Sequence, residues 1–258
     1  SISDLRKKNC PIEQVCENCF SLEVLQVDTI MEQTIYFFTS RSPIGRLTFD
    51  IVSELNEEHS WFLYTIESKA ESASFESGAH SPDLIVSFLN PYIIPKSLLD
   101  QVRGRAFNVH PATPDYPGRD PQHFAFYEGA SVVGATLHRM DESVDSGEIL
   151  DVLERSVDRS RGIMNYIEFS ERLSTAILVK NLPAMLEGSL RPLVHESWHS
   201  HARHTRKDFL GMCRIDPGMD REEVKRRIEA FFNPAYRSVY VEVQGYRFVY
   251  DPSEQHQE

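Results

Sequence analysis

Short apolar runs alternate with amphipathic segments along the chain, and this order constrains the fold more than any other feature. Thr34–Thr39 is rich in β-branched and aromatic residues, and Asp83–Leu89 is almost continuously apolar, as in a parallel strand covered on both faces. The longest amphipathic segment, 163–186, repeats apolar residues at helical spacing, and Gly188 follows it. We therefore predict an α/β fold: a Rossmann-like, mostly parallel sheet with helices on both faces.

The same patterns predict the other elements and divide the chain into three parts. The further predicted strands are 60–67, 106–110, 131–140 and 148–157; the further predicted helices are 46–57, 95–101, 122–128 and 221–232. A β-hairpin is predicted at 236–250, around Gln244-Gly245. The predicted parts are an N-terminal extension at 1–33, a main domain at 34–187 and a small C-terminal subdomain at 188–258. The extension either packs on the surface or is disordered.

Composition limits the class of partner. The net charge of −12 gives a nucleic-acid backbone no general attraction, so we expect no nucleic-acid partner. Apolar residues make up 41% of the chain, but they form no membrane-length run. The N-terminus is polar rather than signal-like. We therefore expect a cytoplasmic protein without a membrane partner, and the aromatic hairpin either faces a second subunit, as in a homodimer, or packs on its own domain.

Two clusters of potential metal ligands are present. Cys10, Cys16 and Cys19 lie near the N-terminus, but zinc usually has four ligands with tighter pairing. The tail carries four histidines that suggest a metal-dependent hydrolase as an alternative: His195, His199, His201 and His204. No carboxylate or thiol is spaced to complete a clear site beside them, so we predict ordinary thiols, surface histidines and no metal.

A group of polar residues marks the ends of two predicted strands. Asn108 and His110 are two residues apart in the run 106–110, so they should share one strand face. The next strand is followed by an acidic loop that contains Asp145. Because ligands of parallel α/β sheets bind outside the carboxyl ends of the strands, we expect Asn90, His110 and the 140–145 segment at that edge.

Each of these residues alone also has a structural interpretation, in which Asn108 and His110 bond to each other and Asp145 caps a turn. Together they suggest chemistry. No serine or cysteine nucleophile motif lies beside them, which argues against a covalent acyl-enzyme. The group suits direct acyl transfer between two bound molecules, with Asn108 and His110 donating to an oxyanion. Asp145 would then move the proton released by the attacking amine.

The Asn108-x-His110 pair, the loop ending at Gly118 and the segment 134–150 (GATLHRMDESVDSGEIL) resemble the signature of the folate-dependent formyltransferases. The resemblance covers about residues 34–187. It implies Asn108, His110 and Asp145 as catalytic residues and N10-formyltetrahydrofolate as the formyl donor. It further implies that the pterin of the donor contacts Phe88, Leu89, Asn90, Met140, Asp141, Glu142 and Ser143.

The acceptor follows from the branch that the chain resembles. Pro111-Ala112-Thr113-Pro114 stands where the tRNA-directed branch has a Ser-Leu-Leu-Pro run, and only about 70 residues follow the main domain. The tail is similar to those of nucleotide-sugar N-formyltransferases, most of all the GDP-perosamine type of O-antigen biosynthesis. A nucleotide-linked amino sugar is therefore the expected acceptor, and Tyr92, Tyr116 and Arg119 either line its pocket or serve packing. A methionyl-tRNA or glycinamide ribonucleotide enzyme, or a non-catalytic binding module of the same fold, is the alternative.

Overall fold

The computed structural model describes residues 31–66, 68–73, 75, 80–199 and 203–254. Cys10, Cys16, Cys19, His201 and nearly all of the predicted N-terminal extension lie outside these residues. In the described part, no helix has the length and apolarity needed to cross a membrane.

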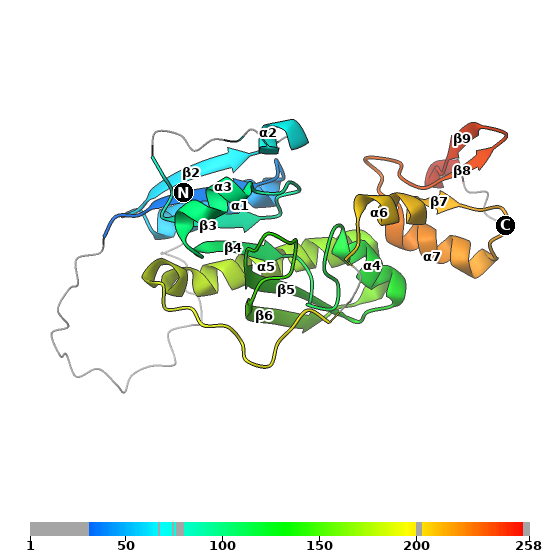
Figure 1. Cartoon of the computed structure of the whole chain (residues 1–258). Coiled ribbons are helices and arrows are strands. Elements are labelled where there is room, and N and C mark those ends of the chain that lie inside the picture. Colours follow the sequence, from blue (N-terminus) through cyan, green and yellow to red (C-terminus); the bar gives the residue numbers. More distant parts are fainter. Residues whose placement is uncertain (1–30, 67, 74, 76–79, 200–202, 255–258) are drawn as a thin grey trace, which may run out of the picture. The chain divides into compact units, whose positions relative to one another are not determined.

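A six-stranded sheet occupies the centre of the fold (Figure 1). Its strands are β1 (Thr34–Thr39), β2 (Ser60–Thr65), β3 (Leu84–Phe88), β4 (Ala106–His110), β5 (Val132–Arg139) and β6 (Ile149–Ser156), in the order β2-β1-β3-β4-β5-β6. The first four strands run parallel. The α/β class, and a strand at each of these six places, are confirmed.

The direction of β5 departs from the sequence-based expectation. β5 pairs antiparallel with β4, so Arg139 lies beside Phe107 and Thr136 beside His110. The end of β5 is therefore at the beginning of β4, and the prediction that 140–145 leaves the carboxyl edge is wrong. Strand direction depends on how the chain returns through 111–131, which the local apolar pattern of 131–140 does not encode.

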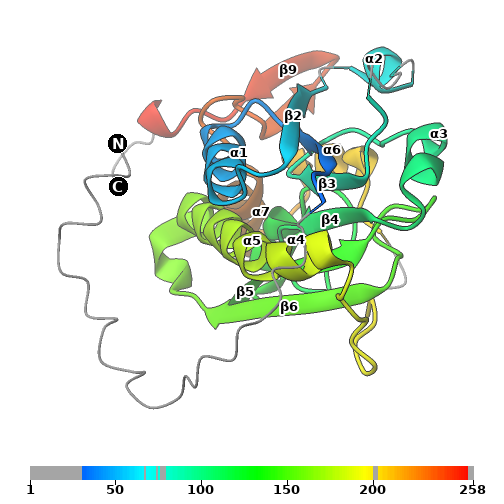
Figure 2. The same ribbon diagram turned by 90° about the vertical axis from the view of Figure 1, so that its left-hand side faces the viewer.

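Helices cover both faces of the sheet, as predicted (Figure 2). One face packs against α1 (Pro43–Leu55) and α5 (Gly162–Glu187), with Phe37, Val86 and Ile177 in its apolar cluster. The other face packs against α3 (Lys96–Leu99), with Tyr36, Ile85 and Leu98 in a second cluster. The short helices α2 (Lys69–Ala73) and α4 (Pro121–Glu128) and the 3-10 turns Asp100–Val102 and Arg159–Arg161 complete this part.

The C-terminal residues add a second, three-stranded sheet. Its elements are α6 (Arg206–Cys213), β7 (Arg214–Ile215), α7 (Arg221–Phe231), β8 (Tyr240–Val243) and β9 (Tyr246–Val249), with a last 3-10 turn at Pro252–Glu254. The hairpin β8–β9 and helix α7 are confirmed, whereas α6 and β7 were not predicted. Tyr246 and Phe248 on the hairpin are 72% and 57% exposed, and the second subunit expected there stays a prediction.

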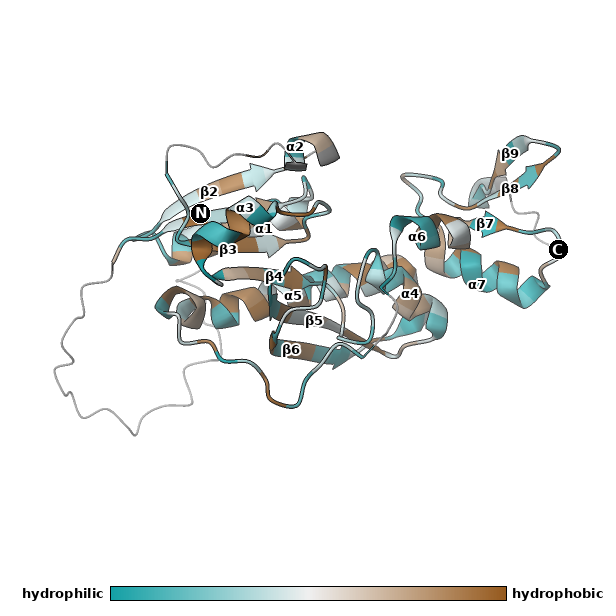
Figure 3. Cartoon of the chain, in the orientation of Figure 1, coloured by the Kyte–Doolittle hydropathy of each residue, from teal (hydrophilic) through white to brown (hydrophobic). Residues whose placement is uncertain are grey.

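The apolar core continues from the central sheet into these C-terminal elements. α7 is largely hydrophilic (Figure 3), but Ala230 and Phe231 at its end are fully buried in the cluster that contains the sheet residues. His123 of α4 contacts both residues. Its Nδ1–H donates to the Ala230 carbonyl at 2.6 Å, and its ring stacks on Phe231. Burial lowers the pKa of His123 below its ordinary value of 6.5.

We predict that His123 makes the stability of this junction depend on pH. Because its pKa is lower in the folded than in the unfolded chain, its contribution is complete above pH 6.5 and is lost as the pH falls below that value. The His123→Asn variant should lose some stability at pH 8, because ring packing is lost. Its free energy of unfolding should then fall less steeply between pH 6.5 and 5, by up to about 1.4 kcal/mol per pH unit.

Urea unfolding at several pH values measures these slopes. The His195→Asn variant supplies the control for the substitution itself, because it replaces an exposed ring instead of the ring buried at this junction. Equal slopes for His123→Asn and the wild-type chain would contradict the prediction.

Candidate active site

The side chains of Asn108 and His110 leave β4 on the face opposite the main core cluster. The alternate residues Phe107 and Val109 pack into that cluster. The alternation of the strand therefore places Asn108 and His110 together on the other face. His110 is 3% exposed, whereas Asn108 is half-buried. Asn108 is thus the more open end of the pair.

The antiparallel β5 adds a residue that the sequence analysis did not select. His138 pairs in register with Asn108, and the Asn108 Nδ2 atom lies 3.0 Å from His138 Nε2. The His138 Nδ1–H donates to the carbonyl of Arg139 at 2.8 Å, which leaves Nε2 to accept from the amide. His138 lies inside an apolar run, and only the strand direction reveals that it faces Asn108.

Asp145 reaches the same face through the loop between β5 and β6. Its Oδ2 atom accepts from the Gly118 N–H at 2.7 Å and lies 3.4 Å from His110 Nδ1, and its Oδ1 atom lies 3.4 Å from His138 Nε2. The structure therefore brings Asn108, His110 and Asp145 together, although β5 runs opposite to the expected direction.

Two glycines make this approach possible. A Cβ on Gly118 would lie 2.4 Å from the carbonyl oxygen of His204, and a Cβ on Gly147 would lie 2.0 Å from that of Arg139. Both distances are too short for any side chain. The D-x-G pattern of residues 145–147 thus has a steric cause, while Asp145 itself adopts a left-handed φ of 46°.

Burial and neighbouring groups shift the pKa values of this cluster in opposite directions. Burial raises the pKa of the Asp145 carboxyl, but the adjacent imidazoles of His110 and His138 and the Gly118 N–H together lower it to about 2. For His110, burial outweighs the nearby carboxylate and lowers the pKa below 6.5. At neutral pH we therefore expect an ionised Asp145 beside a neutral His110.

The neutral His110 ring has a defined tautomer. Its Nε2 atom lies 2.8 Å from the carbonyl oxygen of Tyr116, which can only accept, so the proton is on Nε2. Its Nδ1 lone pair then faces Asp145. The N–H predicted to hold an oxyanion is engaged with Tyr116, while the amide of Asn108 has a second N–H with no partner among the described residues.

An extended segment from the tail covers this cluster. The Trp198 Nε1–H donates to the Gly147 carbonyl at 3.0 Å, and its ring packs edge-to-face on both His110 and His138. Trp198 was not among the predicted site residues, because it is 53 residues beyond Asp145 in a region predicted to be a separate subdomain.

The residues predicted to contact the donor lie in two segments beside Asn108. The Phe88 side chain is fully buried in the core, so only its main chain is available, and Leu89 has a left-handed φ of 50°. Asn90 closes a turn by bonding both the N–H and the carbonyl of Tyr92. Tyr92, which was predicted for the acceptor pocket, and Met140 both pack against the second apolar cluster.

The loop after Met140 is connected to α3. Glu142 pairs with Lys96 of α3 at 2.8 Å, and the Asp141 carboxylate accepts from the Glu142 N–H. The Ser143 carbonyl accepts from the Ser146 hydroxyl. Exposed pairs of this kind contribute little stability, but this one connects the predicted donor loop 140–143 to α3, which follows the segment 88–90 in the chain.

The residues predicted on the acceptor side have different environments. Tyr116 is half-buried, and burial raises its pKa to about 12. The Arg119 side chain is 44% exposed, and its Nε lies 3.5 Å from the Asp120 carboxylate. Its main-chain N–H donates to the His204 carbonyl at 2.7 Å, which places Arg119 beside Arg203 and Arg206 of the tail.

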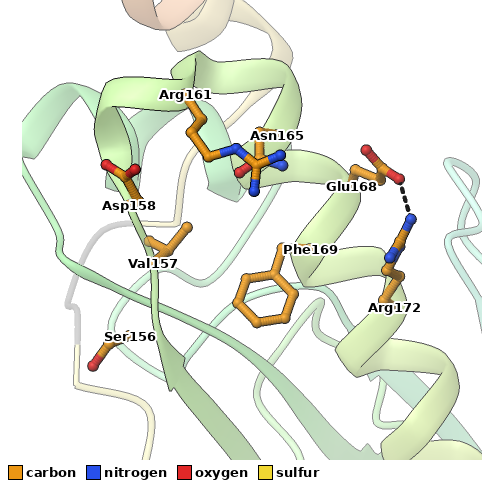
Figure 4. A pocket seen from close by; sticks show the side chains of 8 residues that line it. All are labelled: Ser156, Val157, Asp158, Arg161, Asn165, Glu168, Phe169 and Arg172. Atoms are coloured by element: carbon orange, nitrogen blue, oxygen red, sulfur yellow. Dashed lines mark hydrogen bonds and ion pairs between the residues drawn. The ribbon is translucent and has the colours of Figure 1, made fainter.

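No group of three histidine, cysteine or acidic residues in the described part of the chain is placed to hold a metal ion. A cavity of about 340 Å³ lies away from the polar cluster, between the end of β6 and the start of α5 (Figure 4). It is lined by Arg161, Asn165, Glu168, Phe169 and Arg172, among others, and includes none of the predicted site residues.

The fold and the site together define an α/β protein with a half-buried amide beside a buried imidazole and carboxylate over its central strands. Residues 42–179 match the family model described as formyl transferase. The chain belongs to the formyl transferase family.

The sequence is similar to curated methionyl-tRNA formyltransferases. A methionyl-tRNA formyltransferase of Geobacillus thermodenitrificans is 30% identical over 155 residues, which are 59% of this chain and 48% of the relative. The chain thus spans about half the length of the curated relatives it matches.

Solved structures share the fold over more of the chain. A sugar N-formyltransferase from a Shewanella species has a TM-score of 0.69 at 17% identity, covering 88% of this chain and 99% of that one. The formyltransferase PseJ from Anoxybacillus kamchatkensis, in complex with UDP-4,6-dideoxy-4-formamido-L-AltNAc and tetrahydrofolate, has a TM-score of 0.57 at 21% identity. It covers 77% of this chain and 99% of its own.

We predict that His110 carries its proton on Nε2 and titrates below the ordinary histidine pKa of 6.5. ¹⁵N NMR of the histidine side chains distinguishes the two tautomers and follows each ring through a pH titration, with the exposed His195 as the reference. A proton on Nδ1 in the neutral ring, or titration of His110 above pH 6.5, would contradict the assignment.

Proposed function

We propose that this protein is a sugar N-formyltransferase that moves a formyl group from N10-formyltetrahydrofolate to the amino group of a nucleotide-linked amino-deoxy sugar. The observation that carries the proposal is the convergence of Asn108, His110 and Asp145. His110 and Asp145 are almost fully buried, and the amide of Asn108 beside them is half-buried. The expected setting is O-antigen biosynthesis, with GDP-perosamine as one candidate acceptor.

The residues around Asn108 fit a folate donor. The main chain of Leu89 and Asn90 at the end of β3 offers polar groups, and Tyr92 and Met140 offer apolar surface for a flat ring. Such a donor would supply the formyl carbon. The segments 88–90 and 140–143 would hold it next to Asn108, and the Lys96–Glu142 pair attaches the second of them to α3.

Each catalytic residue has a role that follows from its hydrogen bonds. The second N–H of Asn108 points to a role in stabilising the negative charge that develops on the formyl oxygen. The Nδ1 lone pair of His110 would take the proton that the acceptor amine gives up, and Asp145 would stabilise the resulting imidazolium. The same proton would then go to the nitrogen from which the formyl carbon departs.

A cluster of three arginines supports a diphosphate-linked acceptor. Arg203 Nε donates to the Asp145 carbonyl at 3.4 Å, while Arg119 Nε and Arg206 Nη1 lie 3.5 and 3.8 Å from the same Asp120 oxygen. Asp120 thus faces two of the three guanidinium groups, and Arg203 bonds only a main-chain carbonyl. Guanidinium groups suit phosphate oxygens, so we expect these three arginines to bind an anion close to Asp145.

A tRNA acceptor is the second candidate, because the curated relatives reported above are methionyl-tRNA formyltransferases. A panel containing nucleotide-linked amino sugars, glycinamide ribonucleotide and initiator methionyl-tRNA decides between these acceptors. Mass spectrometry should show one added formyl group on a nucleotide sugar. Formylation of the tRNA alone would overturn the sugar assignment, and ligand binding without turnover would identify a non-catalytic module.

Asn108→Ala should lower kcat by about 100- to 1000-fold, as expected when one oxyanion donor is removed. Asp145→Asn keeps a side chain that tolerates the left-handed backbone but removes the charge, and should lower kcat to a similar extent. Asn165→Ala, on a distant helix, is the matched control. Near-normal turnover in both site variants would exclude these roles.

Arg203→Gln and Arg206→Gln should each raise KM for the nucleotide sugar roughly tenfold, because a charge-assisted contact to phosphate is lost. The effect on kcat should be smaller. Arg155→Gln at the end of β6 removes an exposed arginine elsewhere and should leave KM unchanged. Unchanged KM in both cluster variants would remove the diphosphate assignment.

A further inference from the structure

The segment that leads from α5 to α6 is attached to both loops of the candidate site. On one side of Trp198, the Leu193 N–H donates to the Ile149 carbonyl at 2.8 Å. On the other side, the His199 N–H donates to the Pro114 carbonyl at 3.2 Å, and the His199 ring pairs with Asp115 at 2.8 Å. The chain is thus held at both ends of a short stretch, with Trp198 between the attachments.

Trp198 itself contacts both imidazoles. Its ring centroid lies 5.5 Å from that of His110 and 5.0 Å from that of His138, with interplanar angles of 79° and 89°. Its Nε1–H fixes the ring to the Gly147 carbonyl, two residues from Asp145. His110 and His138 are only 3% and 2% exposed beneath this cover.

We infer that Trp198 is a positioning residue for formyl transfer: its indole fixes the two imidazoles and keeps water away from them. This inference rests on the proposed function. A removable plug would need a mobile support, whereas Trp198 is attached through its own N–H and through the main chain on both sides. The indole therefore forms a permanent wall of the site, and Asn108 remains the open side.

The pH response of His110 shows whether this wall is functional. His110 faces Asp145 from the β5–β6 loop, His138 from β5 and the Tyr116 carbonyl from the loop after β4. Two further charged groups attach to the same loops: Arg203, bonded to the Asp145 carbonyl, and Asp115, paired with His199. Removal of the indole would admit water while all these groups remain.

The test compares Trp198→Ala and Trp198→Phe with the wild-type chain. In Trp198→Ala the acid limb of the pH profile of kcat/KM should move up toward pH 6.5, because a hydrated His110 is protonated more easily. The kcat should fall about tenfold or more, with KM for the acceptor nearly unchanged. Trp198→Phe retains an aromatic ring over the imidazoles and should restore most of the wild-type profile.

Trp61 is a matched control. Its Nε1–H also donates to a backbone carbonyl, that of Asn56 at 3.1 Å, and its ring also packs edge-to-face, on Phe49. Trp61→Ala should reduce stability without moving the acid limb. If Trp198→Ala behaves in the same way, Trp198 has only a structural role; if it raises kcat, Trp198 obstructs the site. Either result overturns the inference.

A histidine titration separates this inference from the proposed function. ¹⁵N NMR of Trp198→Ala should show a higher pKa for His110 than the wild-type chain, whether or not any acceptor is formylated. If the panel of acceptors gives no turnover but this shift is present, the proposed function fails while the role of Trp198 in shielding His110 stands. An unchanged His110 titration overturns the inference even in an active enzyme.

Discussion

A buried carboxylate determines much of the architecture around it. An ionised side chain removed from water needs compensating partners, and Asp145 accepts from the Gly118 N–H with the rings of His110 and His138 beside it. Each partner places a demand on a different part of the chain. The register of β4 with β5 places the histidines, and the absence of a Cβ at Gly118 lets the loop and the tail approach each other.

The tail belongs to this arrangement as much as the sheet does. Its main chain pairs with the loop at Gly118, and its aromatic residues enter the same apolar cluster as the strands. Removal of the charge from Asp145 would affect contacts on both sides of that junction. Chemistry and stability therefore depend on the same few hydrogen bonds.

Local patterns were enough to place the strands and most helices, because apolar spacing depends on which face of each element is buried. They were also enough to select Asn108, His110 and Asp145, since alternation along a strand and the D-x-G loop are properties of adjacent residues. The direction of β5 was not accessible, because it depends on pairing between segments about thirty residues apart. His138 and Trp198 were missed for the same reason. Once β5 is antiparallel, His138 must lie opposite Asn108, and the indole follows only from the path of the tail.

Because β5 runs antiparallel to β4, the length of the loop after β5 is constrained. Arg139 lies beside Phe107, so the chain must return past three residues of β4, about 10 Å, before Asp145 can reach His110. Asp145 lies six positions after Arg139, a span that could extend about 20 Å, and the loop must also rise over the sheet face and turn at Ser143. Little slack remains. Among related sequences, the spacing between this strand and its carboxylate should vary much less than the identity of the residues between them.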